Sequence, residues 1–218
     1  MKRIFDIAKN TQLFKAIAFS DFEPMLNCLS VRVAKHKKND IILLSGDTVN
    51  FVGLVLSGSV KIIKEDIDGK ITLLTSLGIS EVFGEVFACA GIDHSPVTII
   101  AAEDSEIMMM DYKKIVHSCT NACMFHTKLI ENMMKLLATK NLQMNQKIEI
   151  LSKRSTREKL LSFFDAQRGA AKKFTIPYSR EELADYLCVD RSAMSNELSK
   201  MRDEGLIAYK KNVFELLL

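Results

Sequence analysis

The stretch from residue 179 to residue 207, SREELADYLCVDRSAMSNELSKMRDEGLI, constrains the fold more than any other part of the chain. Ser179 and Glu182 have the S-x-x-E spacing of a capping box, which predicts the start of a short helix. A turn is expected at Cys188, and Asp190 can cap a second helix. The stretch therefore predicts a helix-turn-helix, whose second helix enters the DNA major groove.

The second predicted helix has one apolar face and one polar face. Met194, Leu198 and Met201 recur at i, i+4 and i+7, so they form one buried stripe. Short polar or charged side chains occupy the other side and can approach a duplex closely. The candidate DNA-binding residues are Arg191, Ser192, Ser195 and Asn196 in this helix, together with Ser179 and Arg180 at the start of the first helix. Helix pairs of this length also occur in protein cores without DNA, so the spacing alone leaves that alternative open.

A predicted β-hairpin follows the two helices directly. Its strands are Leu206–Tyr209 and Val213–Leu217, and the turn Lys210-Lys211-Asn212 is basic. A helix-turn-helix followed by such a hairpin is typical of a winged helix. The formal net charge of the chain is only +3, and this excess lies in residues 153–218. Any DNA affinity must therefore come from where the charges are placed rather than from bulk charge.

The N-terminal half has a different pattern. Residues 1–30 are expected to be helical, with Ser20 and Glu23 as another capping box. From residue 31 to residue 110, short β-type runs alternate with turn residues, and Asp68-Gly69 is a strong hairpin signal. Many short strands at this spacing predict an antiparallel β-roll, which is as often a plain scaffold as a container for a small ligand. A short helix is expected at Val86–Ala90.

A long helix is predicted from Met124 to Leu151. It carries a heptad seam with alternating spacings of four and three, formed by Ile130, Met134, Leu137, Asn141, Met144, Ile148 and Leu151. Such a seam favours a coiled-coil homodimer, and one polar residue on it, Asn141, can fix the register. A second stripe, Phe125, Leu129, Met133 and Leu136, can pack on the roll. A helix buried on two sides inside a monomer is the alternative.

The cysteine content and the hydropathy of the chain indicate the cellular compartment in which the protein is expected. Five cysteines at irregular spacing are expected to be reduced thiols in a cytosol. No apolar run approaches the roughly 20 residues that span a bilayer, and the basic N-terminus has no apolar segment behind it. The protein is expected to be cytoplasmic, without a membrane partner.

A glycine-punctuated β-roll, a long dimer helix and a winged helix together resemble the CRP/FNR family of bacterial transcription regulators. The most specific motifs are F-G-E at Phe83–Glu85, S-G-S-V-K-I at Ser57–Ile62 and the helix-turn-helix. The resemblance implies an α+β fold, with a jelly-roll sensor domain of the cyclic-nucleotide-binding type at 1–123, a dimerisation helix and hinge at 124–152, and a winged helix-turn-helix at 153–218. It also implies a regulator, not an enzyme, whose partners are an operator in double-stranded DNA, a second copy of the chain and RNA polymerase.

The same resemblance assigns roles to the DNA-binding residues. Arg180 is expected to contact backbone phosphate, and Arg191 can pair bidentately with a guanine. Ser192 stands where a Glu is frequent in the family, and Asn196 where an Arg is frequent. Because Asn pairs with adenine, the operator is expected to differ from the best-known half-sites of the family.

The residues of the candidate effector pocket differ from those of the cyclic-AMP-binding members of the family. The candidate pocket residues are Gly84, Glu85, Ser95, Leu142 and Gln143. Those members place an Arg-Ser pair where this chain has Ser95 and Pro96, so the cyclic phosphate loses its cationic partner. Leu142 and Gln143 replace the hydroxyl residues that meet the base. We therefore expect cyclic AMP to bind poorly or not at all; the effector is unknown, and no cofactor is predicted.

The sequence leaves other functions open beside that of a regulator. His117, Cys119, Cys123 and His126 form a local group suited to a soft metal or to thiol sensing, but the spacing matches no common zinc module, so no metal site is predicted. A cupin-like metal-dependent enzyme would need clustered histidines, and the roll has only His36 and His94. A small-molecule binding protein without a DNA function is the other alternative.

Overall fold

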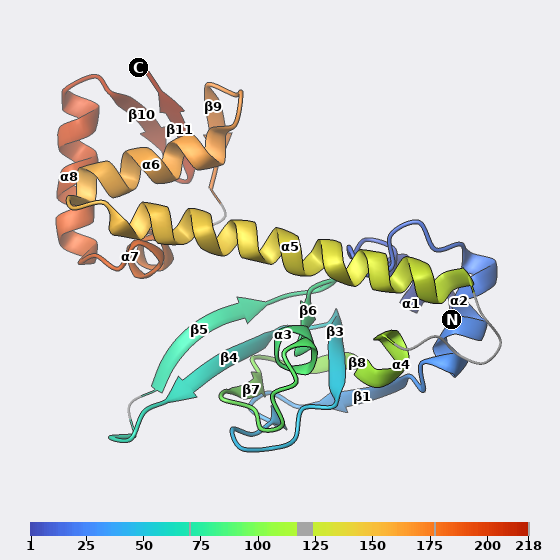
Figure 1. The fold of residues 1–218 in the computed structure, drawn as a ribbon. Helices are drawn as coiled ribbons and strands as arrows, with labels where there is room; N and C mark the ends of the chain where they lie inside the picture. The colour runs from blue at the N-terminus through green and yellow to red at the C-terminus, as the bar shows by residue number, and fades with distance from the viewer. Residues whose placement is uncertain (70, 117–123, 177, 218) are drawn as a thin grey trace. The chain divides into compact units, whose positions relative to one another are not determined.

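The computed structural model describes residues 1–69, 71–116, 124–176 and 178–217. The chain divides into two compact units, Met1–Ala138 and Thr139–Leu218. The boundary lies inside the long helix α5, Met124–Ser152, so the two halves of the predicted dimerisation helix belong to different units (Figure 1).

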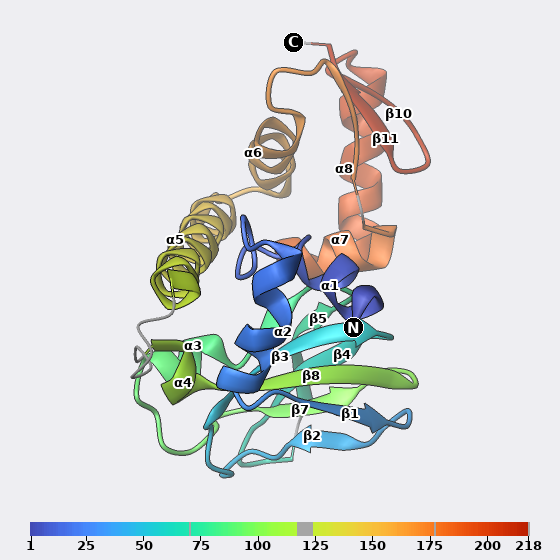
Figure 2. The same ribbon diagram turned by 90° about the vertical axis from the view of Figure 1, so that its right-hand side faces the viewer.

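The first unit contains two antiparallel four-stranded sheets (Figures 1 and 2). One sheet has the order β1 (Arg32–His36), β8 (Ser105–Asp111), β3 (Phe51–Ser57) and β6 (Val82–Phe83). The other has the order β2 (Ile41–Leu43), β7 (Thr98–Ala101), β4 (Val60–Glu65) and β5 (Ile71–Leu77). The predicted hairpin at Asp68-Gly69 joins β4 to β5, and Gly69 has the positive φ of 76° that such a turn requires. The predicted antiparallel roll is confirmed.

The sequence of β3 explains its central position. Val52, Leu54 and Leu56 pack into one apolar cluster, and Val55 packs into a second cluster on the opposite face. A strand that is buried on both faces needs a continuous apolar run rather than an alternating one, and β3 has such a run.

The helices of the first unit are α1 (Lys2–Ala8), α2 (Phe19–Cys28), α3 (Glu85–Cys89), α4 (Tyr112–Val116) and the first part of α5. The predicted helical segment 1–30 is thus broken between Ala8 and Phe19. The predicted capping box at Ser20 and Glu23 is wrong, because α2 begins at Phe19 after Ala18 and no side chain caps it. Instead, packing fixes α2, whose Phe22 and Met25 are fully buried.

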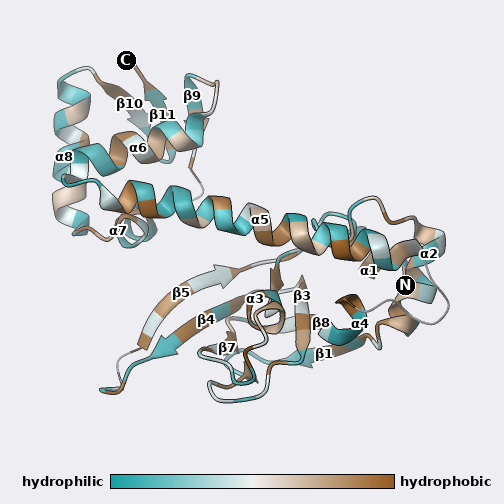
Figure 3. Ribbon diagram, in the orientation of Figure 1, coloured by the Kyte–Doolittle hydropathy of each residue, from teal (hydrophilic) through white to brown (hydrophobic). Residues whose placement is uncertain are grey.

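The second stripe of α5 packs as predicted. Leu129 and Met133 are buried in the same cluster as Phe22 and Met25 of α2, and Phe125 and Leu136 lie at its margin. Along the rest of the helix, apolar and polar bands alternate (Figure 3). Among the described residues, no helix is long and apolar enough to cross a membrane.

The second unit is a winged helix. After the end of α5 it contains α6 (Thr156–Arg168), β9 (Lys173–Thr175), α7 (Arg180–Leu187), α8 (Arg191–Asp203), β10 (Ile207–Lys210) and β11 (Val213–Leu216). The three strands form one antiparallel sheet with β11 in the centre. Phe163, Leu183, Leu198 and Phe214 meet in the core, and Ile150 of α5 is buried with them. The last turns of α5 therefore fold as part of this unit.

Candidate nucleic-acid interface

The first helix of the predicted motif begins as the sequence indicates. The N–H of Glu182 donates to Ser179 Oγ over 3.2 Å, and the N–H of Ser179 donates to Glu182 Oε2 over 2.7 Å. These two bonds close the predicted capping box. Leu183, Ala184 and Leu187 are buried, which turns α7 inward along one face.

The turn and the second helix follow the same pattern. Cys188 adopts the left-handed conformation, with φ 50° and ψ 55°, and ends α7. Asp190 then caps α8, because its Oδ1 accepts from the Ala193 N–H at 2.8 Å and from the Ser192 hydroxyl at 2.6 Å. The Ser192 hydroxyl, followed by the Ala193 N–H, holds the pKa of Asp190 below its usual value. The predicted stripe of Met194, Leu198 and Met201 is buried.

The outer face of α8 presents the predicted base-reading side chains. Arg191, Ser192 and Asn196 are exposed, and Ser195 is half-buried. The hydroxyl of Ser195 donates back to the Arg191 carbonyl at 2.9 Å, and Ser192 is engaged with Asp190. Within the described part of the chain, the side chains of Arg191 and Asn196 have no hydrogen-bond partner. These two side chains are thus the ones available to a ligand.

A salt-bridge cluster that the sequence analysis missed fixes α8 against α6. Arg157 binds both carboxylate oxygens of Glu204, at 2.7 and 2.8 Å, and donates from Nε to Glu197 at 2.5 Å. Glu204 and then Glu197 raise the pKa of Arg157, and Arg157 lowers the pKa of Glu204. The carboxylates of Glu197 in α8 and of Glu204 at its C-cap are thereby neutralised. Because the residues of these ion pairs are distant in sequence, no local sequence pattern predicts them.

Arg180 is the first residue of α7, and its side chain lies against the β-hairpin of the wing. Its guanidinium carbon lies 4.8 Å from the ring centroid of Tyr209 and 4.9 Å from that of Phe214, which is cation–π geometry. Its Nη2 donates to the carbonyl of Lys211 at 3.4 Å, and burial lowers its pKa. Its Nη1 is buried without a hydrogen-bond partner among the described residues. Contact with a phosphate stays a prediction for this residue.

The wing supplies basic side chains beside the helix pair. Lys210 and Lys211 are exposed at the turn between β10 and β11, and Lys211 has a positive φ of 54°. The predicted hairpin and its basic tip are therefore confirmed. With the outer face of α8, this tip gives the second unit a cationic edge suited to a phosphate backbone.

The predicted effector residues do not share one unit. Gly84 caps α3 with a positive φ of 81°, and a Cβ there would lie 2.9 Å from the Phe51 carbonyl oxygen. Glu85 is 1% exposed. Ser95 is buried, and its hydroxyl donates to the Val97 carbonyl at 2.6 Å, so this hydroxyl is already used by the loop. Leu142 and Gln143 belong to the other unit, where both are exposed.

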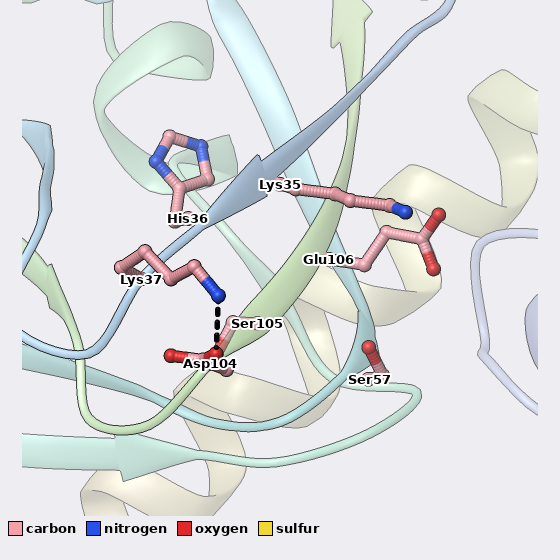
Figure 4. A pocket seen from close by; sticks show the side chains of 7 residues that line it. All are labelled: Lys35, His36, Lys37, Ser57, Asp104, Ser105 and Glu106. Atoms are coloured by element: carbon pink, nitrogen blue, oxygen red, sulfur yellow. Dashed lines mark hydrogen bonds and ion pairs between the residues drawn. The ribbon is translucent and has the colours of Figure 1, made fainter.

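A cavity of about 310 Å³ opens at the junction of β1 and β8 (Figure 4). Its lining residues are Lys35, His36, Lys37, Ser57, Asp104, Ser105 and Glu106. Lys37 Nζ is bound to Asp104 at 2.8 Å, and Arg3 is bound to Glu106. The charges of this cavity are thus largely paired within the protein, and it contains none of the predicted effector residues.

The predicted heptad seam of α5 is exposed over much of its length. Met134, Met144 and Ile148 are 67%, 64% and 61% exposed. Asn141 is exposed and accepts a hydrogen bond from Asn145 at 3.0 Å, whereas Ile130, Leu137 and Leu151 are half-buried. Large apolar side chains left in water at this spacing need a partner surface.

The predicted soft-metal or thiol group lies mostly outside the described residues. His117, Cys119 and Cys123 belong to that part of the chain, and His126 is described. Among the described residues, no group of three or more histidine, cysteine or carboxylate side chains could hold a metal ion. His126 instead meets Cys28 of α2.

Two protein-family profiles match the chain. The Cyclic nucleotide-binding domain matches residues 33–120, and the Crp-like helix-turn-helix domain matches residues 158–217. Together these matches cover more than half of the chain. The transcriptional activator protein FnrA of Stutzerimonas stutzeri is 23% identical over 180 residues, which are 78% of this chain and 70% of FnrA.

Solved structures share the fold over nearly the whole length. The catabolite activator protein of Thermus thermophilus is 21% identical, with a TM-score of 0.55 over 94% of this chain and 93% of that one. The regulator CLP of Xanthomonas campestris, described as responsive to c-di-GMP, is 18% identical, with a TM-score of 0.61 over 90% of this chain and 99% of that one. The Crp-like helix-turn-helix profile and FnrA are those of transcription regulators and not of enzymes, so these matches give no support to a cupin-like enzyme.

Proposed function

The chain belongs to the CRP/FNR family of DNA-binding transcription regulators, and on that basis we propose that it works as a homodimer whose two winged helices read the half-sites of one operator. It does this in the cytoplasm, where the DNA is, and it contacts RNA polymerase from the bound operator. The β-roll serves as a sensor for an effector other than cyclic AMP.

The outer face of α8 carries this proposal. Arg191 is exposed as the first residue of α8 and Asn196 is exposed in its second turn, and this helix is capped at Asp190 and braced by Arg157. An arginine fork matches the two acceptors of guanine, and an asparagine amide matches adenine. Because their side chains are not engaged within the described structure, both can turn toward base edges without breaking an internal bond.

The exposed seam of α5 supports the homodimer. Met134, Met144 and Ile148 lie at heptad spacing and face solvent in the single chain. Burying them against a second copy gains roughly 25 cal/mol for each Å² of apolar surface. A parallel pair of α5 helices would also bring Asn141 opposite its symmetry mate, where a polar pair specifies register.

The sensor proposal rests on the pocket residues. Ser95 and Pro96 replace the cationic and hydroxyl groups expected around a cyclic phosphate, and the Ser95 hydroxyl is bound to Val97. A phosphate held there would lack a cationic partner. Regulators with this fold also differ in effector, since CLP is described as responsive to c-di-GMP.

The DNA-reading role is tested by selecting genomic fragments with the purified full chain and titrating the chosen operator. We expect Arg191→Ala to lower the preference for operator over scrambled DNA by about 5- to 150-fold, the equivalent of 1–3 kcal/mol. Lys64→Ala is the matched control, because it removes one exposed cation from β4 of the other unit, outside the winged helix. Equal discrimination in wild type and Arg191→Ala would contradict the assignment.

The homodimer is tested by sedimentation equilibrium. Met144→Glu combined with Ile148→Glu places charges on the seam and should convert a micromolar dimer to a monomer. Gln146→Glu, on an exposed position off the seam, adds the same kind of charge and should leave the dimer intact. A monomeric wild type would contradict the proposal.

The sensor is tested by calorimetry with cyclic AMP and the full chain. We expect no measurable binding, because nothing at Ser95 and Pro96 compensates the phosphate. Submicromolar affinity would refute this part and leave the DNA-reading part untouched.

A further inference from the structure

Lys147 is more buried than the residues around it in α5. Residues 141–146, 148 and 149 are exposed, whereas Lys147 is half-buried. Lysine is ordinarily among the most exposed residue types, and large apolar side chains are the ones expected to be covered. The order is reversed here, because Met144 and Ile148 are 64% and 61% exposed. A specific contact therefore holds the Lys147 side chain against the protein.

That contact is with an aromatic ring of α7. Lys147 Nζ lies 4.6 Å from the ring centroid of Tyr186, which is cation–π geometry. The Tyr186 ring is itself fixed, because it packs against Phe163 and Tyr178 with centroid separations of 5.4 and 5.3 Å. Burial raises the pKa of Tyr186, so the phenol stays neutral at physiological pH and its ring face attracts the ammonium group.

The same end of α7 is also held from α6. Lys159 Nζ donates to the carbonyl of Leu187 at 3.1 Å, and Leu187 is fully buried. A cation is favourable at this end of a helix, where the last carbonyls are unpaired. Tyr186 and Leu187 directly precede Cys188, at which the chain turns toward α8. One lysine from α5 and one from α6 thus fix the last turn of α7 beside the turn of the helix-turn-helix.

The face of α5 that contacts α7 is separate from the heptad seam. Lys147 and Ile150 are three positions apart, so they lie on one face of the helix, and Ile150 is buried in the core of the winged helix. At 3.6 residues per turn, Lys147 is rotated by about 60° from Met144 and by about 100° from Ile148. One face of this helix end therefore holds the winged helix of its own chain, and the other is the proposed surface for a second copy.

The proposed seam offers Lys147 no ion pair. In the heptad repeat Lys147 occupies position g, and residues at g commonly pair with charged residues at position e of the facing helix. The e positions of this seam are Ala138, Asn145 and Ser152, and none of them is charged. The aromatic contact within the chain is therefore the interaction that accounts for this lysine.

We propose that Lys147 is a positioning residue, which sets the angle between the dimer helix and the helix-turn-helix and thereby the spacing of half-sites that the protein accepts. This inference rests on the proposed function, because it requires a homodimer that reads two half-sites. In that dimer the two α5 helices are joined along the seam. The contact between Lys147 and Tyr186 then determines where each α8 lies relative to the shared axis.

The geometry of DNA turns this angle into a spacing preference. One added base pair moves a half-site by about 3.4 Å along the duplex and rotates it by roughly 35°. A winged helix that is held at α7 cannot follow this displacement without breaking the contact between Lys147 and Tyr186. A winged helix that is already released from Lys147 follows it more easily, so the penalty for a wrong spacing becomes smaller.

The test uses the full chain and the operator selected from genomic fragments. Binding is titrated with that operator, with versions whose half-sites are one base pair closer or farther apart, and with a single half-site. We expect wild type to bind both altered operators more weakly by about tenfold or more. Lys147→Gln should lower this penalty by about two- to fivefold, the equivalent of one broken cation–π contact, and leave single half-site affinity unchanged. Lys135→Gln removes an exposed cation from the same helix and should keep the wild-type penalty.

A double-mutant cycle assigns the effect to the ring. Tyr186→Phe keeps an aromatic face and should behave as wild type, whereas Tyr186→Leu should lower the penalty as Lys147→Gln does. The double variant Lys147→Gln with Tyr186→Leu should add little to either single change, because both remove the same contact. Lys147→Arg keeps a cation at the ring and should retain the wild-type penalty. If Tyr186→Leu fails to fold, the comparison of Lys147→Gln with Lys147→Arg still decides.

Two results would overturn the positioning role while leaving the proposed function intact. One is an unchanged spacing penalty in Lys147→Gln, measured where wild type discriminates between spacings. The other is a lower affinity of Lys147→Gln for the single half-site, which would make Lys147 a direct DNA contact. A wild type that binds every spacing as tightly as the selected operator would refute the proposed dimeric reading together with this inference, so the two failures are told apart by the wild-type titration.

Discussion

Cys188 offers a direct test of how the turn of the helix-turn-helix is built. Its φ of 50° and ψ of 55° place it in the left-handed region, which costs a residue with a Cβ about 1–2 kcal/mol. Glycine adopts this conformation without that cost, but loses about 0.5–1 kcal/mol more conformational entropy on folding. We therefore expect Cys188→Gly to stabilise the second unit by about 0.5–1 kcal/mol.

Little else changes at this position. The Cys188 side chain is exposed, so its loss removes little packing. The backbone N–H of Cys188 donates to the Asp185 carbonyl at 3.1 Å, and glycine retains this bond. In a unit the size of residues 139–218, the gain corresponds to about 2–8 °C in melting temperature.

The assay is calorimetry and urea unfolding of the full chain, following the transition of the second unit. Cys188→Ala keeps the strain and loses only the thiol, so it should match wild type. Asp185→Gly places glycine on an exposed position in the same helix, where φ is helical, and should lower stability by about 1 kcal/mol. If Cys188→Gly were no more stable than Cys188→Ala, the strain argument would be refuted.

Three further predictions concern caps, core and glycine. The pKa of Asp190 is lowered in the folded protein, so the stability that its carboxylate contributes is full above its unfolded pKa and is lost as pH falls through the folded pKa. Asp190→Asn caps the helix without titrating, so urea unfolding of this variant should show a shallower loss of stability below about pH 4. Leu198→Ala should destabilise the second unit by about 2–5 kcal/mol, seen as a lower urea midpoint with the other unit's transition unchanged. Gly84→Ala has to adopt a φ of 81° and brings a Cβ to 2.9 Å from the Phe51 oxygen, so calorimetry should show the first unit destabilised by about 1–3 kcal/mol.

Local sequence patterns were sufficient to predict features that depend only on nearby residues. A capping box needs two side chains three residues apart, and the predicted box at Ser179 is present, as is a second one at Ser155. The one at Ser20 is absent, because α2 starts one residue earlier and is fixed by the burial of Phe22 instead. The same spacing therefore forms a cap only when packing leaves the serine just outside the helix.

The candidate interface was largely predictable because a helix places its faces by a fixed period. The positions of Met194 and Leu198 predicted that Asn196, on the other side of α8, would be exposed. Arg191 is exposed as the first residue of the helix. The engagement of the hydroxyls of Ser192 and Ser195 was not foreseen, since it depends on the rotamers adopted around Asp190. Arg180 likewise has the expected place in the chain, while its stacking on the wing depends on how the hairpin folds back.

The sequence by itself determined the roll, the long helix, the winged helix and the residues that face outward on α8. Each of these follows from a repeat of two or of 3.6 residues and from short-range capping and turn chemistry, which act within a few positions. Only the tertiary structure decided that Arg157 braces α8, that α5 is shared between two units, and that Cys28 lies against His126. These contacts join residues that are far apart in the chain, and no local periodicity specifies which distant partner a side chain will meet.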